Sequence, residues 1–368
     1  MLSIGSGNGV LKLISRNSRR VLQGDASESS SGVREGFPTT PGPRLLIAPD
    51  SFKGTFSAAE VATALARGVV AAGATADSCP LADGGEGTAG VLAAALGGHR
   101  HRVRVHDPLG RLVEAELFLL EGGTVAALDV AAASGLPLLD PAELDPVAAG
   151  TYGTGELIAA AIEAGARTVL VAAGGSATSD GGRGAIEALR ERGGAGDVRI
   201  EILCDVETLF EDAVVVFGPQ KGADPATVRA LTARLIAFAA TLPRDPLGMP
   251  MGGAAGGLSG GLWATFGATL RPGAAYVLET LGFDARLTAA HLAISGEGRL
   301  DFQSLRGKVV GTVAGRCRRA GRPLHVVVGR DDLEPQLVAE LGAASIREAS
   351  TLDALVAAGR EIGAAALG

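Results

Sequence analysis

The sequence predicts an α/β fold, and two observations lead to this prediction. From Arg44 to the end of the chain, short apolar segments alternate with glycine-containing turns and alanine-rich helical segments. This pattern is typical of a mainly parallel sheet with helices on both faces. Hydrophobic residues make up 47% of the chain, which is enough for large cores and excludes global disorder. The length of 368 residues corresponds to two domains at roughly 150 residues each.

The first elements have clear boundaries. RLLIAPD (44–50) reads as a short buried strand. Ser57 is placed to cap the helix that follows, and Glu60 completes an S-x-x-E capping box with it. The glycine pair 97–98 ends the next helix. Residues 101–130 predict alternating strands joined by turns at DPLG and EGG.

The alternation of strands and helices then resumes. A helix is expected at 156–165, and Asp224 caps a long helix with Pro225 at its first position. Buried strands are expected at 167–175, 198–205, 291–298 and 323–329. Polar clusters follow LLIAPD, VLVAAGG, EILCD and LAISGEG. Because ligands of parallel sheets bind at the carboxyl ends of strands, a site is expected there.

Composition excludes several classes of function. The net charge is −7 and no basic stripe is present, so we expect no nucleic-acid partner. No apolar run reaches about 18 residues, so we expect no membrane span. Three scattered cysteines without a CxxC pair predict a reduced, cytoplasmic setting. The five histidines form no zinc motif. His106 is read as a turn residue, with a substrate contact as the alternative.

The N-terminal segment is read separately. Its first 24 residues carry four basic side chains and no acid, which superficially resembles a transit peptide. We expect instead that residues 1–43 form a disordered extension, or that translation starts further downstream. The stretch 27–43 is rich in Ser, Gly and Pro and reads as a linker.

Lysine is rare in this chain, and its placement is informative. Of 33 basic residues, 29 are arginine and only four are lysine. Lys53, Lys221 and Lys308 each adjoin a glycine. A compact ammonium beside a glycine, whose backbone N–H can approach closely, suits a phosphate group. The alternative is chance placement in a chain with 55 glycines.

Glycine-rich loops that carry acids complete this pattern. They lie at 82–87, 174–182, 217–224 and 295–301, and a fifth acid-bearing segment, CDVE at 204–207, lies among them without a glycine of its own. Phosphoryl transfer needs glycine loops for phosphates, carboxylates for Mg²⁺ and a carboxylate near the attacking hydroxyl. Each loop taken singly reads equally as a turn or a helix cap. Their joint occurrence favours nucleotide chemistry.

Known nucleotide and hydrolase motifs do not explain the chain. GxxxxGK[ST] is absent, because Phe302 stands where its first glycine is required, and GxGxxG is absent too. G-x-S-x-G occurs at 257–261. However, GGAAGG precedes its serine where a nucleophile elbow needs a strand, which argues against a hydrolase.

At these loops the sequence resembles the bacterial glycerate kinase family, the type that phosphorylates D-glycerate. The matching strings run in family order from Arg44 to about Gly329. They are IAPDSFKG (47–54), PLADGGEGT (80–88), AAASGL (131–136), TYGTGELI (151–158), GGSATSDGG (174–182), FGPQKGA (217–223), GAAGGL (253–258), and SGEGRLD with RGK (295–308).

The resemblance implies an ATP- and Mg²⁺-dependent kinase built from two α/β domains. One domain is flavodoxin-like and discontinuous (44–100 and 271–368), and the second α/β domain (101–270) is inserted into it. The small-molecule substrate would be D-glycerate and the product 2-phosphoglycerate, with 3-phosphoglycerate as the alternative. A homodimer is left open.

The sequence departs from the family pattern in two places that bear on the substrate. Only residues 191–197 remain where the family usually has a few dozen more, and residues 207–213 replace its N-P-L-x-G-x-x-G-A string. Valines 309–310 also stand where a proline is typical. The first two changes put the substrate range in doubt. An inactive paralogue, acting as a nucleotide- or sugar-acid-binding regulatory module, is the alternative function.

Each part of the reaction has candidate residues. Lys53 and Lys308 would neutralise phosphate oxygens, and Asp83 or Asp180 would orient or deprotonate the glycerate hydroxyl. Asp205 and Glu297 are strand-end acids suited to Mg²⁺, with Asp301 as an outer alternative. The candidates for binding substrate or nucleotide are Asp50, Ser51, Gly84, Gly85, Glu86, Gly174, Gly175, Ser176, Lys221, Gly296 and Arg299, with Lys221 the candidate for the substrate carboxylate.

Overall fold

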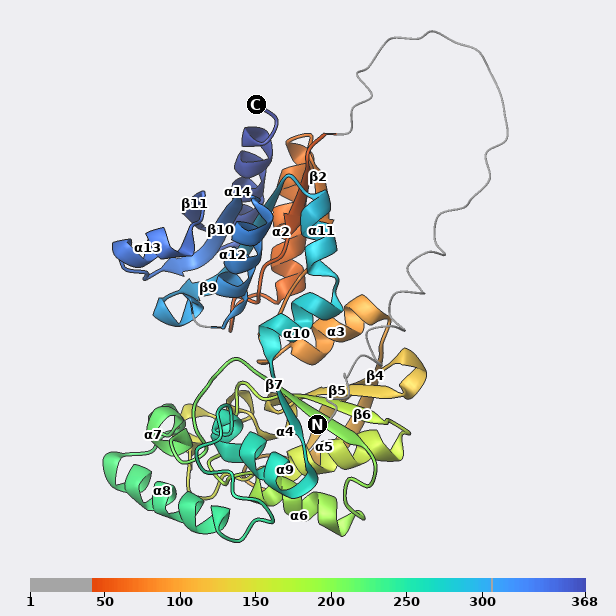
Figure 1. The fold of residues 1–368 in the computed structure, drawn as a ribbon, viewed down its shortest axis with the longest axis vertical. Helices are drawn as coiled ribbons and strands as arrows, with labels where there is room; N and C mark the ends of the chain where they lie inside the picture. Colours follow the sequence, from red (N-terminus) through yellow and green to blue (C-terminus); the bar gives the residue numbers. More distant parts are fainter. Residues whose placement is uncertain (1–41, 306) are drawn as a thin grey trace, which may run out of the picture. The chain divides into compact units, whose positions relative to one another are not determined.

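The structure is a computed structural model that describes residues 42–305 and 307–368, and these residues form two β-sheets (Figure 1). The first sheet has the order β11-β10-β9-β1-β2. Its strands are β1 (Arg44–Ile47), β2 (Thr75–Ser78), β9 (Leu292–Leu300), β10 (Leu324–Asp331) and β11 (Ser345–Glu348). The second sheet has the order β3-β4-β5-β6-β7-β8. Its strands are β3 (His99–His106), β4 (Leu112–Leu120), β5 (Val125–Asp129), β6 (Thr168–Ala172), β7 (Arg199–Cys204) and β8 (Thr269–Pro272).

The first sheet is parallel in all four of its strand pairings. Counted along the chain, its strands lie in the order 2-1-3-4-5, which is the flavodoxin-like order. The direction of winding reverses between β1 and β9, whose register pairs Leu45 with Leu292. The chain between β2 and β9 holds the whole second sheet. The expected flavodoxin-like domain with an inserted α/β domain is therefore confirmed.

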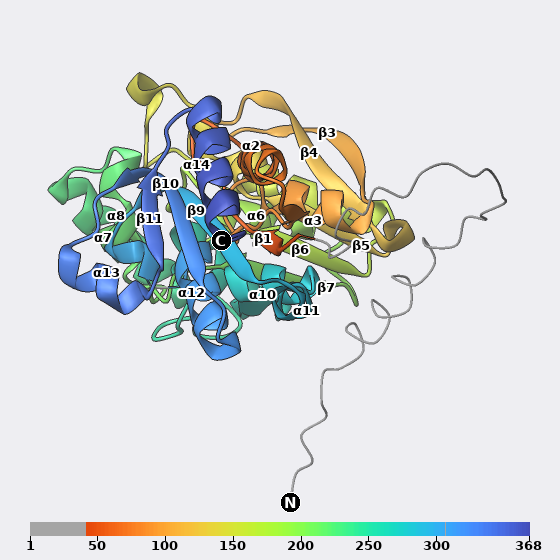
Figure 2. The same ribbon diagram turned by 90° about the horizontal axis from the view of Figure 1, so that it is seen from above.

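Helices α2 (Ala58–Ala71) and α14 (Leu352–Ala365) lie side by side on one face of the first sheet (Figure 2). The predicted capping box begins α2, because Ser57 and Glu60 exchange hydrogen bonds there. The two helices approach closely: a Cβ added at Gly68 would meet the backbone of Val356. Glycine at this position therefore allows the helices to pack at backbone contact.

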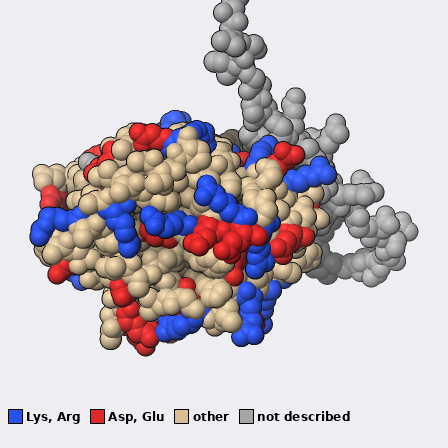
Figure 3. Space-filling model, turned by 90° about the horizontal axis from the view of Figure 1, so that it is seen from below, with Lys and Arg blue, Asp and Glu red and all other residues tan. Residues whose placement is uncertain are grey.

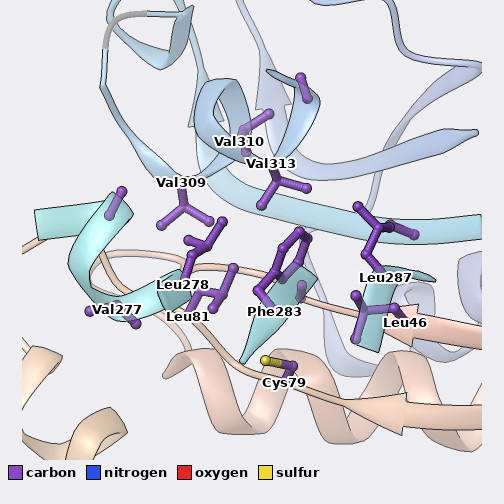
Figure 4. Packing of buried hydrophobic residues seen from close by; sticks show 14 of the residues in the cluster. Leu46, Cys79, Leu81, Val277, Leu278, Phe283, Leu287, Val309, Val310 and Val313 are labelled. Atoms are coloured by element: carbon purple, nitrogen blue, oxygen red, sulfur yellow. The ribbon is translucent and has the colours of Figure 1, made fainter. Parts of the chain in front are cut away.

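The other face of the first sheet is covered by helices that follow the second sheet in the sequence. They are α11 (Phe283–Ala289), α12 (Val309–Ala320) and α13 (Pro335–Leu341). The same core continues into α10 (Gly273–Thr280) and α3 (Thr88–Leu96), which pack against the second sheet. Phe283 is fully buried at the centre of this core, between Leu278, Val313 and Leu46 (Figure 4). Burying one such side chain stabilises the fold by about 1.5–3 kcal/mol.

The second sheet is mixed. Strands β3, β4 and β5 pair antiparallel, as the predicted hairpin turns require, and β5 to β8 are parallel. Asp107 fixes the first turn by accepting hydrogen bonds from the N–H groups of Leu109 and Arg111. One face packs against α4 (Ala131–Ser134), α5 (Tyr152–Glu163), α6 (Arg183–Glu191) and α9 (Leu258–Phe266). The other face contributes Leu120, Ala127, Leu170 and Leu203 to the core beneath α3 and α10.

A small hydrophobic cluster joins α7 (Ala213–Phe217) to α8 (Pro225–Ala239), with Phe210 at its centre. Asp224 caps α8 as predicted, because its side chain accepts a hydrogen bond from the N–H of Thr227. This cluster lies in the region where the sequence departs from the family pattern. The replaced segment 207–213 therefore still supports packed helices.

The remaining expectations about organisation have different outcomes. The proposed extension at 1–43 lies outside the described residues up to Pro41. The domain bounds stay a prediction, and the strands of the second sheet span 99–272. In the part of the chain that the structure describes, no helix is long and apolar enough to cross a membrane. Basic and acidic side chains are intermingled on the face in Figure 3.

Candidate active site

A pocket of about 380 Å³ lies at the carboxyl edge of the first sheet, where the winding reverses between β1 and β9. Ligands of doubly wound sheets bind at this position. We call it the acid–lysine pocket. Its charged and hydroxyl-bearing lining residues are Asp50, Ser51, Lys53, Thr55, Asp83, Glu297, Arg299, Asp301, Lys308, Arg330 and Ser350.

The turn after β1 is held against β9. The N–H of Asp50 donates to the carbonyl of Gly296 at 2.8 Å, and Gly298 passes so close that an added Cβ would lie 3.1 Å from Cα of Phe52. Gly296 itself lies inside the sheet, against the backbone of Val327. Its carbonyl therefore supports the site, and its lack of a side chain serves packing.

Lys53 and Asp83 lie next to each other in the pocket. The Lys53 Nζ lies 3.7 Å from Asp83 Oδ2, and the lysine side chain is 62% exposed while the carboxylate is buried. Asp83 Oδ1 also accepts a hydrogen bond from the N–H of Gly85 at 2.9 Å. The pKa of Lys53 is raised, mainly by Asp83, although burial opposes this shift. Lys53 is thus a protonated cation that reaches into solvent.

Three further acids around the pocket hold protons more tightly than usual. Burial, reinforced by repulsion from Asp83, raises the pKa of Asp50 to about 8 and that of Asp205 to about 6. Burial also raises the pKa of Glu297 to about 7. Crowded carboxylates of this kind release their protons when a cation arrives. The site is therefore built to accept positive charge.

Glu297 carries the most direct sign of a missing partner. Its side chain is buried, and Oε1 has no hydrogen-bond partner. A buried, unpartnered carboxylate oxygen is costly unless a ligand or ion completes it. Nevertheless, no three His, Cys, Asp or Glu side chains within residues 42–305 and 307–368 lie close enough to hold a metal by themselves.

Loops from the second sheet complete the site. The N–H of Gly174 donates to the carbonyl of Gly84 at 3.1 Å, and a Cβ on Gly174 would lie 2.5 Å from Cα of Gly85. A Cβ on Gly84 would in turn lie 2.8 Å from the backbone of Leu203 in β7. Only glycines permit this contact between loops. It brings the ends of β6 and β7 beside Asp83.

Lys308 lies in the chain after β9 of the first sheet, and Asp205 directly follows β7 of the second sheet. Lys308 begins α12 as its N-cap residue, and Gly307 approaches the carbonyl of Asp205. The two side chains interact, since the charge of Lys308 acts to lower the pKa of Asp205 against the larger effect of burial. The structure therefore brings both predicted lysines, Lys53 and Lys308, to the same group of acids.

The outer residues of the pocket pair with one another. Arg299 donates to Asp332 at 2.6 Å and lies 4.0 Å from Asp301. Asp301 Oδ1 accepts from the N–H of Gln303, so this acid also fixes its own turn. Ser51 lines the pocket, and its N–H donates to Asp50 Oδ1 at 2.6 Å.

Asp180 is not part of this group. Its carboxylate accepts hydrogen bonds from the N–H and hydroxyl of Thr151 and from the N–H groups of Gly182 and Gly184, at 2.8–3.0 Å. It lines a separate cavity of about 230 Å³, together with Arg183. These contacts fit a structural role, fixing a turn, better than the predicted role in proton transfer.

The predicted role of Asp180 can be tested against the structural one. In Asp180→Asn, one carboxylate oxygen that accepts from Thr151 and Gly184 is replaced by an NH2 group, which cannot accept. We expect this change to lower the free energy of unfolding by about 1–2 kcal/mol. Denaturant unfolding measures this loss. The exposed Asp197, changed to Asn, is the matched control in the same sheet region. An unchanged stability with lost turnover would return Asp180 to the catalytic group.

Lys221 and Ser176 also lie away from the pocket. Lys221 is 2% exposed, and its Nζ donates to Ser176 Oγ at 3.1 Å and to the carbonyl of Thr178 at 2.5 Å. Burial lowers the pKa of this lysine to about 7. The carbonyl of Gly175 accepts from the N–H of Leu136. This part of the predicted glycine loop binds its own chain, so Lys221 is poorly placed for a substrate carboxylate.

Comparison with known protein sequences shows which family this chain belongs to. The sequence model described as "Glycerate kinase family" matches residues 45–193 and 191–362. The chain belongs to the glycerate kinase family. Within this family, a glycerate kinase from Halalkalibacterium halodurans is 37% identical over 322 residues, which cover 77% of this chain and 85% of the relative. The glycerate 2-kinase of Escherichia coli is 36% identical over 323 residues, covering 78% and 85%.

A solved structure supports the same family assignment. A crystal structure from Salmonella typhimurium LT2, provisionally named glycerate kinase 2, superposes with a TM-score of 0.74 at 34% identity. The superposition covers 88% of this chain and 98% of the Salmonella chain. The two matched segments of the glycerate kinase family model meet at residues 191–193. This is the place where the sequence is shorter than the family pattern.

Sequence reasoning missed three residues that line the acid–lysine pocket, and one acid that binds the end of the loop at 82–87. Arg330 and Ser350 line the acid–lysine pocket from β10 and from the segment after β11. Thr55 lines it from the turn after β1. Asp129 ends β5 and accepts from the N–H groups at the start of α3, and burial raises its pKa to about 6. An acid at the end of the strand VAALD was the available signal for Asp129.

Proposed function

We propose that this chain is an ATP-dependent kinase that transfers the γ-phosphate to a hydroxyl of D-glycerate, giving 2-phosphoglycerate. The observation that carries the proposal is the acid–lysine pocket, where Lys53 and Lys308 adjoin the buried Asp50, Asp83 and Glu297. Phosphoryl transfer depends on positioning and on neutralising charge on the phosphate oxygens. This pocket offers cations for the phosphates and carboxylates for a metal and a proton. 3-Phosphoglycerate is the alternative product.

The two lysines would bind the transferring phosphate. Lys53 reaches into solvent at the pocket, so its ammonium can follow the phosphate during transfer. Lys308 begins α12, whose positive helix end adds to its charge. The N–H of Gly84 donates to Thr88 Oγ1 and that of Gly85 to Asp83 Oδ1, so these two glycines would position Asp83 beside the phosphate instead of donating to it.

The acids fit a Mg²⁺ ion carried with ATP. Mg²⁺ prefers oxygen ligands and usually binds through one or two carboxylates together with substrate phosphates. This preference accounts for a site that lacks three close acids among its described residues but leaves Glu297 Oε1 unpartnered. Glu297 and Asp205 would hold the ion, with Asp301 nearby. When bound, it would neutralise charge on the phosphate oxygens.

Asp83 would receive the proton of the glycerate hydroxyl. It lies beside Lys53, so the acceptor of the proton and the cation for the phosphate sit on one side of the pocket. A base must lie within hydrogen-bond reach of the hydroxyl it activates. Placing glycerate between Asp83 and the phosphate meets this condition.

The proposal is tested by ADP release coupled to a reporter enzyme. D-glycerate should stimulate release, whereas L-lactate and tartronate should not. NMR of the product then distinguishes phosphate on O2 from phosphate on O3. The shortened segment at 191–197 favours one alternative, a regulatory module that binds nucleotide or sugar acid without transfer. Binding of ADP with no glycerate-dependent turnover would support that alternative and contradict the kinase.

A further inference from the structure

A second cavity of about 450 Å³ adjoins the acid–lysine pocket. We call it the apolar slot. The residues that line it alone come from the segments 54–59, 80–82 and 86–94, with Ser57 and Glu86 as the polar members. Asp50, Ser51, Lys53 and Thr55 line both cavities. The two are therefore continuous around the turn that follows β1.

The two cavities differ sharply in chemistry. The acid–lysine pocket carries acids, lysines and arginines, whereas the apolar slot is bounded mainly by small apolar side chains and glycines. Small-molecule sites of a few hundred Å³ are typically apolar, with a few polar groups that fix orientation. A ligand that fills both would have a charged end and a mainly apolar end.

We propose that the apolar slot binds the adenine and ribose of ATP, with the triphosphate passing Lys53 into the acid–lysine pocket. This assignment rests on the proposed kinase function and deepens it. Glycerate does not suit the apolar part of the slot, because its carboxylate and two hydroxyls would lose hydration against Pro80, Leu81 and Val91. The polar lining residues belong to the turn at 50–57 and to Glu86. Glu86 is exposed at the edge of the slot, where its carboxylate can accept hydrogen bonds from ribose hydroxyls.

Gly90 on α3 keeps part of the slot open. It lines the cavity, and a Cβ added there would meet no atom within 4 Å. Its backbone is helical and needs no positive φ, unlike that of Gly87 (φ 90°). A larger side chain at position 90 is therefore tolerated by the backbone and must project into free space. The position offers a selective way to fill the slot.

Gly90→Leu is the test. We expect it to raise the Kd for ADP roughly tenfold or more, because leucine occupies space that the base needs, while the Kd for tripolyphosphate changes little. Isothermal titration calorimetry measures both. Gly315→Leu is the matched control, since Gly315 lies in helix α12 and a Cβ there meets only the end of the Arg319 side chain. It should bind both ligands as the unmodified protein does.

A measurement on the unmodified protein guards against a variant that fails to fold. Adenosine alone should displace ADP, and tripolyphosphate should displace it independently. Unchanged ADP affinity in folded Gly90→Leu, or no competition by adenosine, overturns the assignment. Failure of the kinase itself looks different: ADP and adenosine would still bind the slot, but D-glycerate would not stimulate ADP release.

Discussion

Lys53→Ala is expected to lower kcat for glycerate phosphorylation by roughly 10²-fold or more, because a charge that stabilises only the transition state is lost. The ammonium is 62% exposed at the acid–lysine pocket, 3.7 Å from Asp83. It is therefore free to move with a phosphate that gains charge during transfer. Initial rates of ADP release at saturating ATP and D-glycerate measure the change.

Two further variants separate this role from a general effect of charge. Arg104 is an exposed cation on β3, at the far edge of the second sheet, and Arg104→Ala should leave kcat unchanged. Lys53→Arg keeps the charge but spreads it over a planar fork, so we expect only partial recovery. Near-normal turnover of Lys53→Ala would remove this lysine from the site.

The sequence predicts the local elements well where a single residue decides the geometry. Ser57 with Glu60, and Asp224 with Pro225, begin helices where expected, because capping depends on neighbours within one turn. Three short strands, β2, β8 and β11, have no counterpart in the prediction. Their sequences, TADS, TLRP and SIRE, are short, partly polar and partly exposed. Only pairing with a neighbouring strand makes them extended, and that pairing is not local.

The same difference between local and non-local features decides which site residues could be predicted. Asp50 and Glu297 lie in or beside neighbouring strands of one sheet, so their position at its edge explains why they meet. Asp180 follows β6 by several residues, and its carboxylate binds Thr151, which lies distant in the chain. Strand ends do not reveal where such a loop turns. Ser350 was missed because the strand before it was missed.

The apolar slot could not be predicted from the amino-acid composition. About half of its lining residues are Ala, Gly or Pro, which are common throughout this chain and carry no chemical signature. The cavity exists because α3 and the start of α2 leave space beside the turn after β1. Recognising it requires the packing of these elements and cannot follow from the type of any one residue.

Lys221 gives a large expected effect on stability as a function of pH. The amine is 2% exposed, and its hydrogen bonds go to the neutral Ser176 hydroxyl and Thr178 carbonyl. Burial lowers its pKa from 10.5 to about 7 in the folded chain. Above pH 7 the folded state therefore binds fewer protons than the unfolded state, so its stability must rise with pH until the unfolded lysine also loses its proton.

Between pH 7 and 9 this one group should add about 2–3 kcal/mol to the free energy of unfolding, at 1.36 kcal/mol for each pH unit. Denaturant unfolding of the wild type and of Lys221→Met, compared at each pH, isolates the lysine. The buried thiols and the other titrating groups are common to both proteins and cancel in the difference. Because methionine has no proton to lose, the gap between the two proteins should change steadily across the window. If the free energies of unfolding of the two proteins changed in parallel with pH, Lys221 would keep its charge in the folded protein. Its neighbours would then have to stabilise the buried charge by more than the two hydrogen bonds they make.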